Sequence, residues 1–249
     1  MALILWASYT KIMIYPYTAI LHGALAILCF ASFFYLIYFK KDLDKTSMRA
    51  YFNWFLFFFL YSVLLLLPLI IFNELNLITG RFLNIAFVFL SLAAWQAFNV
   101  ALNLLVSNEQ KRNFFSMLYL IGITIAVILN FIFVEIPVGS ANGKWVLWYS
   151  GEYISFFYTL FMFIAGWTFT FINLKEVSKL QQILLKIRAI LYALAGFILP
   201  FSSLYYFGVQ NMWEVQLSFM FSISGMTLFA IGNIPLGIIL KRRENRKDI

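Results

Sequence analysis

The sequence has few charged residues, one cysteine and one histidine among its 249 positions. Asp, Glu, Lys and Arg make up 11% of the chain, whereas 63% is hydrophobic and the mean hydropathy is +0.89. Soluble domains carry about 25% charged residues, so this composition indicates a membrane protein. The single cysteine, Cys29, excludes an intramolecular disulfide. With one histidine and no cysteine cluster, we expect no protein-built metal site.

The central parts of the hydrophobic segments contain no Asp, Glu, Lys or Arg. This weighs against an ion pump, a proton-coupled carrier and a voltage sensor, which need charge at membrane depth. A light-driven rhodopsin is also disfavoured, because the last hydrophobic segment has no lysine to form a retinal Schiff base. We find no acid–base pair or activated nucleophile in these segments, so we expect neither an enzyme nor a bound cofactor.

Seven hydrophobic segments, each at least twenty residues long, predict seven membrane-spanning helices. They cover residues 15–39, 50–72, 82–106, 114–134, 145–174, 187–207 and 213–240. Outer-membrane strands alternate in polarity over about ten residues, and these segments do not. We therefore predict an all-α seven-helix bundle over 15–240, with an interfacial segment at 1–14 and a basic tail at 241–249.

The lysines and arginines predict the orientation of this bundle. Fifteen of them fall after the first, third, fifth and seventh segments, whereas only Lys11, Arg81 and Lys144 fall on the other side. The positive-inside rule then places the N-terminus outside and the C-terminus in the cytoplasm. Because the basic residues stand in short clusters between apolar segments, we expect a lipid bilayer as the partner of this chain and no nucleic acid.

His22 and Glu152 are ionisable groups predicted at or near membrane depth, both toward the outer side. One interpretation is a titrating pair or an outward-facing ligand site, because histidine changes charge near neutral pH. The other is a neutral His22 bonded to a neighbouring helix and a Glu152 that extends to the membrane surface.

Aromatic and polar residues are densest at the start of the fifth segment. On a helix that begins at Trp145 they would share one face: Trp145, Trp148, Tyr149, Glu152 and Tyr153. They would form either the wall of a pocket that opens outward or an interfacial aromatic belt.

Three amides lie in the third segment at a spacing that places them on one helical face. They are Gln96, Asn99 and Asn103. Unpaired amides are costly in lipid, so we expect this face to point at other helices. The amides would either bond between helices or line the path of a solute.

Prolines mark two further positions of interest, Pro200 in the sixth segment and Pro235 in the seventh. Each removes a backbone hydrogen bond, so each is a candidate hinge or an ordinary kink. An internal repeat has little support, because Pro68 and Pro200 follow the matching Arg-Ala pairs at 49–50 and 188–189 by different distances.

A basic segment leads into the sixth span and to its proline, from Lys186-Ile-Arg188 to Leu199-Pro200. With seven spans, short loops and a basic exit, the chain resembles the seven-helix N-terminal sensor regions of bacterial histidine kinases and related signalling proteins. The resemblance implies a bacterial cytoplasmic membrane and a cytoplasmic signalling partner. No kinase, cyclase or phosphodiesterase domain follows Lys241 in this sequence, so the resemblance concerns the membrane region.

The leading functional hypothesis is a membrane sensor that binds a small ligand in the outer half of the bundle. Its candidate ligand-binding residues are His22, Trp148, Tyr149, Glu152 and Tyr153, with Pro200 and Pro235 as hinges. One alternative is a facilitator or channel for a neutral solute that passes Gln96, Asn99 and Asn103. Another is a structural membrane subunit of a larger complex.

Overall fold

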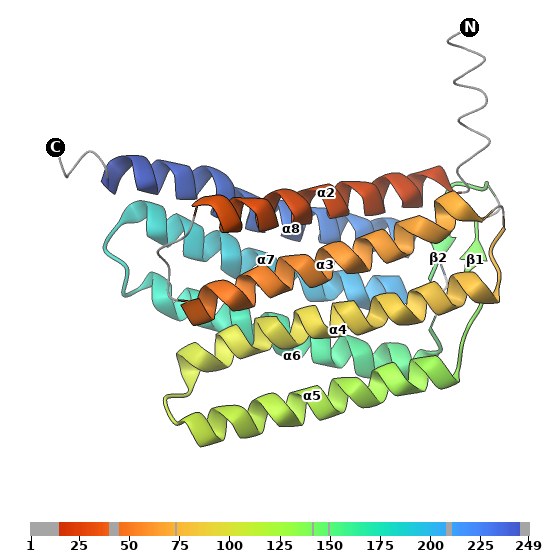
Figure 1. The fold of residues 1–249 in the computed structure, drawn as a ribbon, viewed down its shortest axis with the longest axis horizontal. Helices are drawn as coiled ribbons and strands as arrows, with labels where there is room; N and C mark the ends of the chain where they lie inside the picture. The colour runs from red at the N-terminus through yellow and green to blue at the C-terminus, as the bar shows by residue number, and fades with distance from the viewer. Residues whose placement is uncertain are drawn as a thin grey trace, which may run out of the picture.

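The computed structural model describes residues 15–39, 45–72, 74–140, 142–148, 150–207 and 211–244. Within these ranges, side chains are described for residues 15–37, 49–72, 74–140, 142–148, 150–204, 211 and 213–232. Within these ranges the chain forms seven long helices and one short hairpin (Figure 1). The helices are α2 (Pro16–Phe39), α3 (Lys45–Ile71), α4 (Leu77–Leu105), α5 (Glu109–Ile132), α6 (Glu152–Val177), α7 (Ile183–Phe207) and α8 (Met212–Glu244). The strands are β1 (Val138–Gly139) and β2 (Val146–Leu147).

All seven helices are long and apolar enough to cross a membrane. This confirms the predicted all-α seven-helix bundle and identifies an integral membrane protein. The hairpin β1–β2 lies at one end of the bundle, here called the hairpin end (Figure 1). The opposite end, where α4 joins α5 and α6 joins α7, is here called the loop end.

Six of the helices form a closed ring. Each packs against the next in the order α2, α3, α4, α6, α7 and α8, and α8 packs against α2 to close the circle. The chain therefore forms two three-helix units, α2–α4 and α6–α8, whose corresponding helices run in the same direction along the bundle (Figure 1). The ring encloses the space in which a site can form.

Helix α5 lies outside this ring. Its extensive contacts are with α4 and α6, and it follows one edge of the bundle in Figure 1. Only 22% of its span is buried, against 33–50% for the other six. Most of the α5 surface therefore remains for lipid.

Caps fix where two of the helices begin. Asn76 accepts a hydrogen bond from the Thr79 backbone N–H at 3.1 Å, and the Thr79 hydroxyl bonds back to the Asn76 N–H at 3.3 Å. Asn108 likewise accepts from the Lys111 N–H at 3.1 Å. These side chains satisfy N–H groups that a helix start leaves unpaired, so α4 and α5 each begin five residues before the predicted segments at 82 and 114.

The prediction of one helix over 145–174 is wrong at its start. Residues 146–147 pair with 138–139 in the antiparallel hairpin, and α6 begins only at Glu152. Gly143 turns the hairpin with a φ of 66°, and Gly151 precedes α6 with a φ of 23°. Such backbone conformations interrupt a helix, although the apolar composition continues through them.

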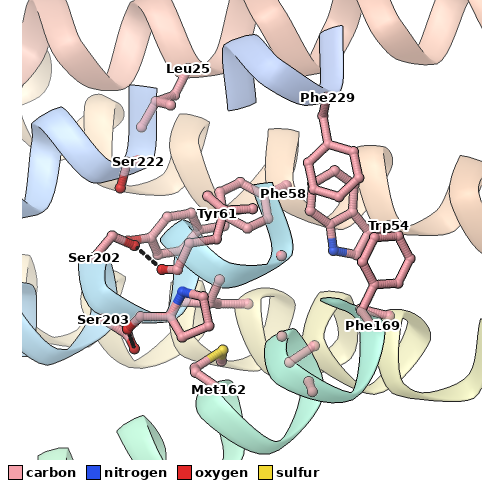
Figure 2. A pocket seen from close by; sticks show the side chains of 18 of the residues that line it. Leu25, Trp54, Phe58, Tyr61, Met162, Phe169, Ser202, Ser203, Ser222 and Phe229 are labelled. Atoms are coloured by element: carbon pink, nitrogen blue, oxygen red, sulfur yellow. Dashed lines mark hydrogen bonds between the residues drawn. The ribbon is translucent and has the colours of Figure 1, made fainter. Parts of the chain in front are cut away.

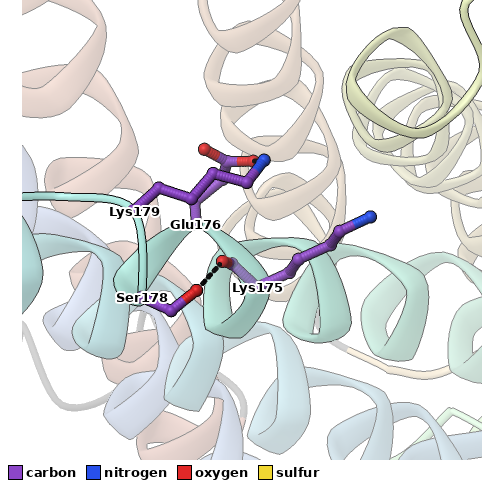
Figure 3. A network of polar contacts seen from close by, with 4 residues as sticks. All are labelled: Lys175, Glu176, Ser178 and Lys179. Carbon is purple, nitrogen blue, oxygen red and sulfur yellow. Dashed lines mark hydrogen bonds and ion pairs between the residues drawn. The ribbon is translucent and has the colours of Figure 1, made fainter.

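Basic residues are concentrated at the loop end. Arg49, Lys111, Arg112, Lys175, Lys179, Lys186 and Arg188 lie there, whereas Arg81 and Lys144 lie at the hairpin end. Figure 3 shows this end of α6, where Lys179 Nζ lies 2.7 Å from Glu176 Oε1 and the Lys175 side chain extends away from that pair. The seven loop-end cations are thus gathered on one side of the bundle.

Candidate ligand site

A cavity lies at the centre of the six-helix ring. Every ring helix contributes to its lining, and α5 does not. The space open to the centre of a water-sized sphere amounts to about 80 Å³, which is enough for a small molecule or several waters. No Asp, Glu, Lys or Arg is found among the described residues that line it. The cavity is thus suited to an uncharged occupant.

One end of the cavity carries most of its hydroxyl groups and is here called the serine end. Its residues are His22, Tyr61, Ser202, Ser203, Ser218 and Ser222. Ser218 Oγ donates to the Ser202 carbonyl at 2.6 Å, which joins α8 to α7. Ser202 and Ser203 donate to the carbonyls of Leu199 and Pro200, each at 2.7 Å. Their hydroxyl protons are committed, while their oxygen lone pairs can still accept.

The other end is built from aromatic rings and is here called the aromatic end. Its residues are Tyr51, Trp54, Phe169 and Phe229. The ring centroids of Trp54 and Phe229 are 4.8 Å apart, and those of Phe169 and Phe229 are 5.6 Å apart. Figure 2 shows Trp54, Phe169 and Phe229 gathered on one side and the serines with Tyr61 on the other. The cavity is therefore amphipathic along its length.

Tyr61 is the buried polar side chain that best fits a ligand contact. It lines the cavity, is 6% exposed, and its hydroxyl makes no hydrogen bond with the described residues. The Ser222 hydroxyl also lines the cavity without a hydrogen bond to the described residues. Ser222 is partly buried, and both hydroxyls can donate to or accept from a molecule in the cavity.

The hairpin closes the bundle at the serine end. Val146 and Trp148 are fully buried, and the Trp148 ring lies 6.3 Å from that of His22. The Val146 N–H donates to Thr18 Oγ1 at 2.9 Å, and the Lys144 carbonyl accepts from the Tyr17 N–H at 3.1 Å. The hairpin thus caps the N-terminus of α2 and places a buried indole ring beside His22 at this end.

Close packing of two glycines shapes the opposite wall of the cavity, where α6 crosses α7. A Cβ added to Gly166 would clash with Pro200 Cγ and lie 2.5 Å from the Gly196 carbonyl oxygen. Thr170 Oγ1 donates across the same crossing to the Ala193 carbonyl at 3.0 Å. Pro200 has no N–H to give to the Gly196 carbonyl, so this backbone acceptor belongs to the cavity wall.

The predicted ligand-binding residues do not form one site. His22 lines the cavity with its ring against Tyr61 and Phe219, and Trp148 packs behind it. Glu152 and Tyr153 are exposed at the start of α6, with Tyr153 at 82%. Tyr149 lies outside the described residues. The prediction of a shared helical face through Trp145 is wrong, because Trp145 and Trp148 belong to the hairpin.

The predicted amide face of α4 does not reach the cavity. Gln96, Asn99 and Asn103 are partly exposed and make no hydrogen bond with the described residues. The helix presents Leu90, Ala94, Ala97 and Val100 to the cavity instead. The amides therefore lie outside the cavity lining, whereas small and apolar residues form the part of α4 that faces the cavity.

Of the two predicted hinges, Pro200 lies in the cavity wall within α7. Position 235 lies within α8, and its side chain is outside the part of the chain that the structure describes.

The sequence analysis missed Tyr61, Trp54 and the glycine crossing. Tyrosine, tryptophan and phenylalanine make up 20% of the chain, so an aromatic residue carries little signal by itself. Tyr61 and Trp54 do stand seven residues apart with Phe58 between them, which places all three on one face of α3. No group of three or more His, Cys, Asp or Glu suited to a metal occurs in the described parts of the chain.

No protein-family model matches this chain, and no curated protein matches it.

Proposed function

We propose that this protein is a membrane sensor that binds a small, uncharged, largely apolar molecule in the central cavity. The observation that carries the proposal is a closed ring of six helices around a cavity that Tyr61 and Ser222 line, with hydroxyls that make no hydrogen bond to the described residues. Binding sites are typically apolar cavities with a few convergent polar groups. Because no charged side chain contributes to the described lining, the proposed role is binding rather than acid–base catalysis.

The aromatic end supplies a route from ligand to membrane surface. The Phe229 ring lies 5.3 Å from that of Tyr192, and the Tyr192 hydroxyl accepts from Arg188 Nε at 3.0 Å and Nη2 at 2.8 Å. Arg188 belongs to the cationic loop end. A ligand that displaces Phe229 would therefore shift Tyr192 and the Arg188 guanidinium, and a partner protein bound at the loop end would respond to that shift. The ligand shifts this equilibrium only as far as it prefers one of the two states.

The orientation and the location belong to the same proposal. We place the loop end in the cytoplasm, because positive residues are retained on that side of a membrane. The signalling partner would then be cytoplasmic. The similarity to bacterial sensor regions supports a bacterial cytoplasmic membrane.

The test fills the cavity. Ala94→Leu adds bulk to the lining, whereas Ala31→Leu adds the same bulk to an exposed position on α2. We expect native mass spectrometry of the protein from mild detergent to detect a retained small molecule in the wild type and in Ala31→Leu. Its loss from Ala94→Leu alone supports the proposal. Equal retention in both variants would contradict it, and a stoichiometric protein without a small molecule would favour a structural subunit.

One observation favours a second candidate function, a facilitator for a small neutral solute. The units α2–α4 and α6–α8 run in the same direction on either side of the cavity, as parallel repeats do in some transporters. A facilitator predicts that proteoliposomes release trapped glycerol faster than empty liposomes, and that Ala94→Leu abolishes the difference. Equal rates would leave the sensor as the better account.

A further inference from the structure

The cavity is long and narrow. Its lining runs from Ala50 to Tyr61 on α3 and from Ser218 to Phe229 on α8. Eleven residues of helix rise over about 16 Å, so both helices give the same length. The space open to the centres of water-sized spheres is about 80 Å³, and averaged over about 16 Å of helix axis it gives a section of about 5 Å². This length and mean section favour an elongated molecule over a compact one.

The two ends of the cavity have different chemistry. At the serine end, the Tyr61 and Ser222 hydroxyls can donate or accept, and the bonded serine oxygens can accept. A neutral hydroxyl group, which also donates and accepts, matches this set. A carboxylate or ammonium does not, because the described lining offers no opposite charge and burying an unpaired charge is costly.

The aromatic end matches an aliphatic tail. Trp54, Phe58, Phe169 and Phe229 present ring carbons to the cavity, and the Trp54 and Phe58 centroids lie 5.3 Å apart. The polar groups at this end are the indole N–H of Trp54 and the hydroxyl of Tyr51. A methylene chain gains free energy when it leaves water for this apolar surface, and gains less when it comes from lipid.

Resting on the proposed binding function, we infer that the ligand is an unbranched, neutral amphiphile of the fatty-alcohol class. Its hydroxyl lies at the serine end against Tyr61, and its chain extends toward Trp54 and Phe229. The buried Trp148 ring lies beside His22 at the serine end, so the head group meets the hairpin side of the bundle. Recognition then depends on the elongated shape of the cavity and on hydrogen bonds to the neutral hydroxyl group of the ligand.

The experiment uses n-octanol that carries a photoreactive diazirine, with the full chain in proteoliposomes. Labelled residues are mapped by mass spectrometry, and three competitors are compared at equal membrane concentration: n-octanol, cyclooctanol and n-octane. We expect labels on cavity residues and competition by n-octanol at least threefold stronger than by either control. Cyclooctanol keeps the hydroxyl group but is compact, so it tests the requirement for an elongated chain. n-Octane keeps the chain but lacks the hydroxyl group, so it tests the requirement for a head group. Equal competition by n-octane would mean that a lipid tail enters without a head group, which overturns the inference.

Two matched variants test where the head lies. Tyr61→Phe removes one hydroxyl and keeps the ring, and Trp54→Phe removes the indole N–H. Loss of one hydrogen bond corresponds to about a threefold to tenfold loss of affinity. We expect that loss for Tyr61→Phe and no change for Trp54→Phe. The reverse pattern would place the head at the aromatic end and contradict the assignment.

The outcomes separate this inference from the proposed function. If the octanol probe fails to label the cavity while a different small molecule is retained and is lost in Ala94→Leu, the ligand class is wrong and the binding function stands. If the probe fails and Ala94→Leu changes nothing, both are wrong.

Discussion

All seven helices are apolar enough to cross a membrane, yet the six ring helices and α5 differ in how closely the bundle holds them. Ring helices α6 and α7 approach closely because Gly166 and Gly196 face each other beside Pro200. Helix α5 also places a glycine against the ring, since a Cβ added to Gly122 would clash with the Phe161 ring of α6. Three side-chain hydrogen bonds join α5 to the ring as well: Trp95 Nε1 to Ser116 Oγ, Tyr119 OH to the Phe161 carbonyl, and Asn130 Nδ2 to Asn84 Oδ1.

The comparison teaches how a membrane bundle selects its contacts. Lipid tails are as apolar as leucine, so apolar burial by itself does not separate a helix that belongs inside from one that belongs outside. Close backbone approach and polar bonds supply the preference. The ring helices combine both and enclose a cavity, whereas α5 contacts only two of them extensively, is less buried and remains at the edge.

The largest expected effect is at the glycine crossing. Gly166→Ala forces α6 and α7 apart, because the added methyl group meets the rigid Pro200 ring and the Gly196 carbonyl. We expect a loss of roughly 1–3 kcal/mol in the free energy of unfolding, measured by denaturant titration in detergent micelles. Gly23→Ala is the control, because nothing lies within 4 Å of its added Cβ. Equal stability of the two variants would mean that close packing does not hold the ring.

The next largest effect is at the buried amide bond of α5. Asn130→Leu removes the 2.9 Å bond and leaves Asn84, which is 2% exposed, without a side-chain partner. We expect a loss of about 1–2 kcal/mol, with ligand retention by the ring unchanged. The double variant Asn84→Leu, Asn130→Leu should be less destabilised than the sum of the single variants. Additive losses would show that the two amides do not act together.

A smaller effect is expected where α6 meets α4 and closes the ring. Tyr158 is fully buried, its hydroxyl lies 3.1 Å from Ser91 Oγ, and it donates to the Phe87 carbonyl at 3.2 Å. Tyr158→Phe should cost about 1 kcal/mol in the same titration. Tyr153→Phe, at a position that is 82% exposed, should cost nothing measurable. If only Tyr153→Phe lowered the stability, the Tyr158 hydroxyl would not hold α6 against α4.

The smallest effect is expected at the partly exposed bond between Trp95 and Ser116, which is 3.0 Å long. Ser116→Ala should cost about 0.5 kcal/mol, since lipid or water reaches this position. Ser107→Ala, at an exposed site between α4 and α5, serves as the control. If Ser116→Ala lowered the stability more than Asn130→Leu, the strength of the hydrogen bonds that attach α5 would not increase with their burial.

The amides of α4 show why local pattern did not locate the site. Gln96, Asn99 and Asn103 share a face, as their spacing predicts, but that face is partly exposed. Spacing fixes which residues lie together on a helix and leaves open how the helix is rotated in the bundle. The inner face of α4 is set by Ala94 and Ala97, whose small side chains leave room for the cavity.

Trp148 shows a second limit. The apolar run through 145–153 has the composition of a helix start, and the periodic spacing of its aromatic residues matches a helical face. The hairpin formed instead, because its backbone groups bond to Ser140 and to the start of α2: Trp145 donates to Ser140 Oγ, and Val146 donates to Thr18 Oγ1. Thr18 is more than a hundred residues away, so no local pattern contains this information.

The sequence by itself determined the membrane class, the seven helices and the gathering of basic residues at one end, because length and apolar composition are properties of each segment alone. Tertiary structure decided the ring order, the external position of α5 and the cavity between His22 and Phe229. Those depend on which helices approach most closely. That choice was made by a few glycines, one proline and long-range hydrogen bonds, whose partners are far apart along the chain.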